Sequence, residues 1–82
     1  MKIRKANIEN DGKLITNVYL YENKKEEYTM VAIPDIEWST VIPYVEDRTK
    51  RSMRLAKSLE KHVEPQVAIQ LTSKIMQWVY EM

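Results

Sequence analysis

The spacing of hydrophobic residues changes near Pro43, and this change constrains the fold more than any other feature of the sequence. Before Pro43, apolar and polar residues alternate with the period of two that is typical of β-strands. After it, apolar residues recur every three or four positions, as on one side of a helix. The pattern predicts an α+β fold, with strands first and helices second. A chain of 82 residues has room for one hydrophobic core, so we expect residues 1–82 to form a single domain.

The strand-like part predicts a three-stranded antiparallel meander, because short polar segments separate its alternating runs. The strands are expected at about residues 2–8, 13–22 and 27–33. A four-residue loop at Asn23–Glu26 would join the second strand to the third. That loop pairs Tyr21 with Tyr28 and Val18 with Val31.

The first hairpin must turn at Gly12, the only glycine in the chain, which supplies a positive φ angle. A two-residue turn at Asp11-Gly12 would place Ala6 and Ile8 on the same face as the tyrosines. A type I turn with Gly12 as a bulge places them instead beside Leu14, Thr16 and Val18. We predict the bulged turn because it buries more aliphatic surface in one place.

Two amphipathic helices, at about residues 44–63 and 66–81, are predicted to pack on one face of the sheet. Glu64-Pro65 separates them, since proline is best tolerated at the start of a helix. The candidate N-caps of the first helix are Ser39, Thr40 and Asp47. Residues 34–43 are expected to form a loop or a short extension.

The second predicted helix carries an unusually wide apolar stripe. Its main positions and the residues that widen it are Val67, Leu71, Ile75, Trp78, Val79 and Met82, with Ile69, Met76 and Tyr80 beside them. A stripe of this width indicates either deep burial or a second contact.

One candidate interaction surface is the sheet face that points away from the helices. The predicted register gathers five large side chains there: Ile15, Tyr19, Tyr21, Tyr28 and Met30. Aromatic residues and methionine are enriched in protein interfaces, so we expect this face, or the exposed edges of the small sheet, to serve for self-association or for a protein partner.

A second candidate is a basic face of the first helix, in a chain whose net charge is only +1. Its residues are Lys50, Arg51, Arg54, Lys57 and Lys61, which could bind phosphates, an acidic protein or an anionic membrane surface. The tyrosines would lie on the opposite side of the domain, and no RNP-like segment is present. Nucleic-acid binding would then use phosphates alone and would be weak and sensitive to salt.

No catalytic constellation is recognisable in the sequence. His62 is the only histidine and there is no cysteine, which excludes a His-rich metal site, thiolate ligands and disulfides. A single glycine excludes the phosphate-binding loops of nucleotide enzymes. We therefore predict a non-enzymatic protein without cofactor or metal, unless subunits of an oligomer build a pocket between them.

The expected location is the cytoplasm, because the chain has no cysteine, no export signal and no apolar run of membrane-spanning length.

Three segments carry a resemblance that covers nearly the whole chain: Ile15–Lys25, Val31–Trp38 and Gln77–Glu81. Together they resemble the YueH-like family of small, functionally uncharacterised proteins of Bacillus-type bacteria. The resemblance implies a bacterial, cytosolic setting and transfers no active-site residue.

Overall fold

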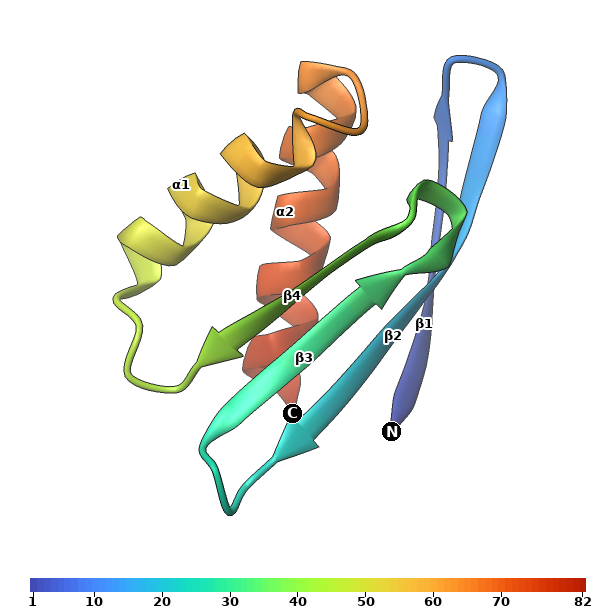
Figure 1. Ribbon diagram of the computed structural model, residues 1–82. Helices are drawn as coiled ribbons and strands as arrows, with labels where there is room; N and C mark the ends of the chain where they lie inside the picture. Colours follow the sequence, from blue (N-terminus) through green and yellow to red (C-terminus); the bar gives the residue numbers. More distant parts are fainter.

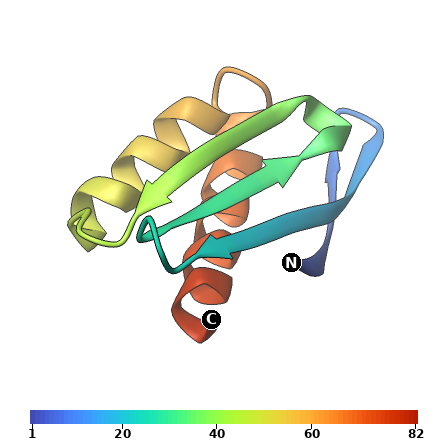
Figure 2. The same ribbon diagram turned by 60° about the horizontal axis from the view of Figure 1, so that its bottom comes forward.

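The computed structural model describes residues 1–82 as a four-stranded antiparallel sheet with two helices on one of its faces (Figures 1 and 2). The strands lie in the order β1-β2-β3-β4, so neighbours in the sequence are neighbours in the sheet. The elements are β1 (Lys2–Asn10), β2 (Lys13–Asn23), β3 (Tyr28–Ile33), the short 3₁₀ helix η1 (Pro34–Ile36), β4 (Trp38–Pro43), α1 (Arg48–Leu59) and α2 (Pro65–Glu81).

The predicted α+β class, with an antiparallel sheet and two helices, is confirmed, but the prediction of three strands was wrong. Residues 34–43 are not a loop, because η1 reverses the chain and β4 then pairs with β3 along its whole length. Glu37 adopts a left-handed conformation (φ 51°) and donates its N–H to the Pro34 carbonyl, which closes the reversal. The Asp35 carboxylate fastens η1 to β2 by accepting the Thr16 N–H at 2.8 Å and the Thr16 hydroxyl at 3.2 Å. These bonds lower the pKa of Asp35, the backbone N–H having the largest effect.

The first hairpin has the two-residue turn at Asp11-Gly12 instead of the predicted bulged turn. Both residues have positive φ angles, 50° and 79°, as a type I′ turn requires. The bulge lies further along β1, between Lys5 and Ile8, where Asn7 also has a positive φ of 53°. The bulge adds one residue to β1, so Ala6 no longer faces Asn17 as the turn alone would require. Ala6 and Ile8 are both buried.

Ile15 lies in the core as a consequence of this register. It pairs with Ile8 and is 0% exposed, whereas Leu14, predicted to face the core, is 54% exposed. Val18 and Leu20, further along β2, are fully buried as well. The inward face of β2 therefore changes parity between Ile15 and Val18, opposite the bulge in β1.

The hairpin between β2 and β3 has a register that differs from the predicted one by two residues. Tyr21 pairs with Met30, Leu20 pairs with Val31, and the loop is Lys24–Glu27. A shift of two leaves every side chain on its expected face. Leu20 and Val31 consequently remain inside.

The first helix is shorter than predicted at both ends. Asp47 is the N-cap, and its carboxylate accepts the Lys50 N–H at 3.1 Å. Residues 60–64 form the turn into α2, whose position agrees with the prediction. The Asn10 side chain accepts the Glu64 N–H at 3.0 Å and so joins this turn to the tip of the first hairpin.

One cluster of sixteen buried hydrophobic residues fills the space between the sheet and the helices. Ile33 from the sheet and Leu55 and Leu71 from the two helices are among its fully buried members. Trp38 is buried as well, and its indole N–H donates to the Ser58 hydroxyl at 3.0 Å, so β4 and α1 share a polar contact. The opposite face of the sheet has no layer over it (Figure 2).

The bulge in β1 predicts an unusual response to substitution at Asn7. Replacing Asn7 by valine should lower the free energy of unfolding by about 1–2 kcal/mol, because a β-branched residue is strained at positive φ. Replacing it by glycine should leave stability unchanged or raised. Urea unfolding measures both, with Glu9→Val as the control at an exposed position of β1 whose φ is ordinary. Equal losses in Asn7→Val and Glu9→Val would contradict the proposed role of the bulge.

Candidate interaction surfaces

Twelve side chains in register form the sheet face that points away from the helices, called here the outer face. They are Ile3, Lys5, Asn17, Tyr19, Tyr21, Asn23, Tyr28, Met30, Ala32, Ser39, Val41 and Pro43. Tyr21, Met30 and Val41 stand side by side on three neighbouring strands. Of these twelve only Lys5 is charged, and its ammonium group donates a hydrogen bond to Asn17 at 2.5 Å. Beyond the bulge, Glu9 pairs with Leu14 and points the same way, which places one carboxylate at the tip of the first hairpin.

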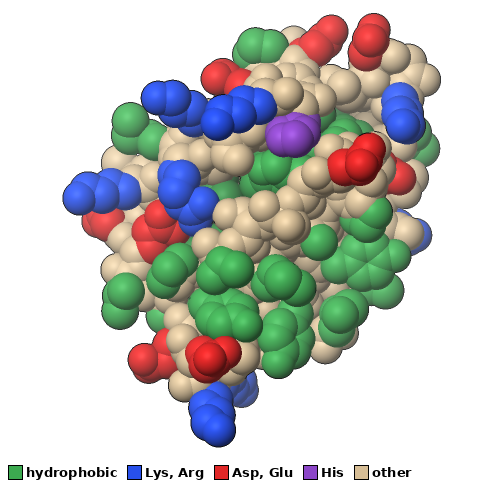
Figure 3. All heavy atoms as spheres, in the orientation of Figure 1, with side chains coloured by type: hydrophobic (Ala, Val, Ile, Leu, Met, Phe, Trp, Pro, Cys, Tyr) green, Lys and Arg blue, Asp and Glu red, His purple; other side chains and the backbone are tan.

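The outer face is accessible to a partner. Ile3 and Val41 are 54% and 47% exposed, Tyr21 and Met30 are 39% and 37% exposed, and Tyr19 and Tyr28 are half-buried. In Figure 3, which views the molecule from the sheet side, hydrophobic side chains gather over the strands and charged ones lie around them. A contiguous apolar surface of this kind is typical of a contact site.

Four of the five residues predicted to lie on this face do lie there: Tyr19, Tyr21, Tyr28 and Met30. Ile15 does not lie there. The inward face of β2 changes opposite the bulge in β1, and Ile15 is buried in the core. Val41 extends the face, and its place there was not predicted because β4 was not predicted. The signal for β4 was the alternation along Trp38–Ile42, in which Trp38, Thr40 and Ile42 share one side and Val41 lies on the other.

Acidic residues border the outer face at the end where β2 and β4 finish. The Tyr44 hydroxyl donates to the Glu22 carboxylate, and the Tyr44 N–H donates to the Glu27 carbonyl at 2.9 Å. The bond to Glu22 is the main cause that raises the pKa of Tyr44 to about 12. Tyr44 therefore remains a neutral donor that ties the β4–α1 connection to the sheet.

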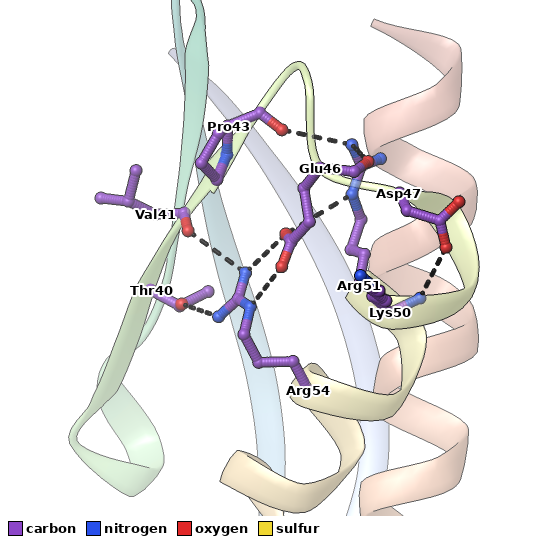
Figure 4. A network of polar contacts seen from close by, with 8 residues as sticks. All are labelled: Thr40, Val41, Pro43, Glu46, Asp47, Lys50, Arg51 and Arg54. Carbon is purple, nitrogen blue, oxygen red and sulfur yellow. Dashed lines mark hydrogen bonds and ion pairs between the residues drawn. The ribbon is translucent and has the colours of Figure 1, made fainter.

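The predicted basic face of the first helix is divided between two roles. Arg51 and Arg54 turn inward to Glu46 and form what we call the arginine cluster (Figure 4). Lys50, Lys57 and Lys61 are exposed, and no ion pair holds them. The five residues are thus not one continuous surface for an anion.

Arg54 is the centre of the arginine cluster. It donates from Nε to Glu46 at 2.7 Å and from Nη2 to the other carboxylate oxygen at 2.9 Å, in the two-bond geometry that suits a guanidinium group. It also bonds the Thr40 hydroxyl at 3.0 Å and the Val41 carbonyl at 3.3 Å. One side chain of α1 thereby holds both β4 and the connection before the helix.

Arg51 completes the cluster by donating to the Glu46 carbonyl at 3.1 Å and to the Pro43 carbonyl at 3.3 Å. Its Nε atom is buried without a hydrogen bond and lies 3.9 Å from the Glu46 carboxylate. Hydrogen bonding from Arg54 lowers the pKa of Glu46, and the same bond raises the pKa of Arg54. Glu46 is therefore held as a carboxylate between two cations.

The residues considered for catalysis occupy separate structural positions. His62 is exposed in the turn after α1, where its backbone N–H donates to the Leu59 carbonyl at 2.9 Å. The Ser58 hydroxyl accepts from Trp38 and has no bond to His62. No group of three or more histidine, aspartate and glutamate side chains is placed to hold a metal ion. Neither helix has the length and apolarity needed to cross a membrane.

Comparison with known proteins identifies relatives along the whole chain. A family model described as YueH-like protein matches residues 2–81. The chain is 52% identical to "Uncharacterized protein YueH" of Bacillus subtilis strain 168, over 82 residues that cover all of both chains. No solved structure matches it.

The arginine cluster predicts an acid-sensitive contribution to stability. Glu46→Gln should lower the free energy of unfolding by about 1 kcal/mol at neutral pH, a value kept small because Arg54 is 38% exposed to water. The pKa of Glu46 is lowered on folding, so its contribution is present above the unfolded value of about 4.3. It is lost as the pH falls through the folded value.

Urea unfolding of wild type and Glu46→Gln at neutral and acid pH measures this difference. The two proteins should converge in acid, where Glu46 is protonated. Glu60→Gln is the matched control, because Glu60 is exposed and its side chain makes no hydrogen bond or ion pair. A difference between wild type and Glu46→Gln that persists in acid would count against the electrostatic explanation.

Proposed function

The chain belongs to the YueH-like family, and we propose that it is a non-enzymatic interaction domain that forms a homodimer through the outer face of its sheet. We also propose a cytoplasmic location, for which the lack of cysteine is the supporting feature.

The near absence of charge on the outer face is the observation that carries the proposal. One of its twelve side chains is charged, in a chain where 30% of all residues are charged. A face selected only for contact with water has no reason to exclude charge so strongly. Depletion of charge, together with tyrosine and methionine, is what the centre of a protein interface shows.

The same feature favours a second copy of the chain as the occupant. A two-fold axis brings identical surfaces together, so any net charge on a face repels itself. The outer face carries no such charge beyond Lys5, which is tied to Asn17. Two outer faces can therefore stack as the two sheets of a sandwich do, about 10 Å apart.

The edges of the sheet are less suited to self-association than its outer face. At the β4 edge, the carbonyls of Val41 and Pro43 accept hydrogen bonds from Arg54 and Arg51. At the β1 edge, the bulge around Asn7 interrupts a regular ladder, and the strand carries the basic side chains of Lys2, Arg4 and Lys5. Charged side chains and bulges are common means by which proteins prevent edge pairing.

Anion binding through the first helix has weaker support. Arg51 and Arg54, two of the five basic residues that define that hypothesis, already pair with Glu46. Phosphates would have to compete with a carboxylate that both guanidinium groups contact. We therefore place self-association first.

Sedimentation velocity over a range of protein concentrations tests the dimer. Wild type should change from monomer to dimer as concentration rises. Tyr21→Glu with Val41→Glu should weaken the dimer by about 100-fold or more, because each copy would bring two unpaired carboxylates into the contact. Both residues are partly exposed, and Met30 separates them, so the monomer should tolerate the change.

Met53→Glu is the matched control, since Met53 is 68% exposed and lies on α1, away from the sheet. It should dimerise as wild type does, and far-UV circular dichroism should show that all variants are folded. A wild type that sediments as a monomer at every concentration overturns the proposal. An unchanged dimer in the double variant overturns the assignment to the outer face.

A further inference from the structure

A groove of about 560 Å³ lies between α1 and α2. Its exposed apolar lining comes from Met53 of α1 and Ile69 of α2, which are 68% and 63% exposed, with Met76 half-buried beside them. Met53 and Ile69 take no part in the core, to which the helices contribute other residues such as Leu55 and Leu71. The groove therefore opens on the side of the helices that the sheet does not cover.

The wide apolar stripe of α2 is explained by this groove. Val67, Leu71 and Ile75 are buried in the core, whereas Ile69 and Tyr80 are 63% and 71% exposed. The helix thus has one apolar side for the core and a second that nothing in the chain covers. The wide stripe was expected to indicate either deep burial or a second contact. The exposure of Ile69 and Tyr80 favours the second contact.

A polar group without a partner lies in the same groove. Thr72 lines it and is only 4% exposed, and the hydroxyl oxygen of Thr72 is buried without a hydrogen bond. An unpaired buried hydroxyl costs about 1–3 kcal/mol. Buried polar groups are normally satisfied, so this hydroxyl is a candidate to pair with a group in the groove once the Thr72 side chain turns toward the opening, because its oxygen is itself buried.

The charge around the groove defines the chemistry of that partner. The first helix contains five basic residues and no acid, and the second contains Lys74 and Glu81. The two helices therefore carry +6 and −1, a net +5, against +1 for the whole chain. Arg51 and Arg54 pair with Glu46, but Arg48 lines the groove and lies 5.8 Å from the centre of the Tyr80 ring. Lys57 is exposed one turn after Met53.

We propose that this groove binds one amphipathic helix of an acidic partner protein. Apolar side chains of that helix, spaced three and four residues apart, enter between Met53, Ile69 and Met76. Its carboxylates face Arg48 and Lys57, and a polar side chain from its apolar side pairs with the Thr72 hydroxyl. Methionine side chains suit such a site because they adapt to the shape of the helix they meet. The inference is independent of the dimer, which uses the opposite side of the molecule.

Synthetic helical peptides provide the test. Three peptides share leucines spaced i, i+3, i+4 and i+7 and carry glutamate, glutamine or lysine at the remaining positions. Titration into ¹⁵N-labelled full-length protein should show that the glutamate peptide binds about tenfold or more tightly than the lysine peptide. Its affinity should fall with added salt. Amide shifts should map to α1 and α2.

Variants of the groove separate the contributions. Met53→Glu and Ile69→Glu should each weaken the glutamate peptide about tenfold or more, and both sites are exposed enough for the fold to persist. Arg48→Gln should reduce the preference for glutamate over lysine. Thr72→Val should weaken peptide binding without lowering the stability of the free protein, since it removes an unpaired hydroxyl. The outer-face variant Tyr21→Glu with Val41→Glu is the control and should bind the peptide as wild type does.

Three results would overturn the proposal. One is equal affinity for the glutamate and lysine peptides, and another is a set of amide shifts located on the sheet. The third is binding to phosphatidylglycerol vesicles that is lost in Met53→Glu, with no binding of the acidic peptide. That result would assign the groove to a membrane surface.

Discussion

The chain builds two layers and no third, and its remaining features follow from this arrangement. Two helices bury the inner face of a four-stranded sheet, and sixteen hydrophobic residues form the core between them. With 82 residues the chain cannot add another layer, so one face of the sheet and one side of the helices stay uncovered. Both uncovered surfaces carry exposed apolar side chains, which a monomer in water does not need. Our functional proposals therefore concern contacts and not chemistry.

The arginine cluster determines which parts of the sheet are available for those contacts. Glu46 holds two arginines of α1 against β4, and the same arginines bond the carbonyls of Val41 and Pro43. A strand edge that would otherwise offer free acceptors is thereby closed. The remaining cations of α1 lie on the outside of the helix layer. One basic segment thus contributes to the fold at one position and to the charge around the groove at another.

Much of the fold could be predicted, and the errors have specific physical causes. The hairpin between β2 and β3 kept its faces despite the wrong register, because a shift of two preserves side-chain parity. The first hairpin was predicted wrongly because Asn7, not Gly12, carries the bulge, and a left-handed asparagine leaves little trace in a sequence. The fourth strand was missed because the six residues Asp35–Thr40, which follow Pro34, looked too short and too mixed for a strand. Its stability comes from pairing with β3 and from Trp38 and Ile42 in the core.

The sequence by itself determined that strands precede helices, that both helices pack against one sheet, and that α2 carries an unusually wide apolar stripe. These features depend on the spacing of hydrophobic residues, which can be read from positions that are close together in the sequence. Only the tertiary structure decided that Ile15 is buried and that Arg51 and Arg54 are paired. The first depends on a bulge in the adjacent strand. The second depends on Glu46 and on carbonyl groups of β4, which approach α1 only when the layers assemble.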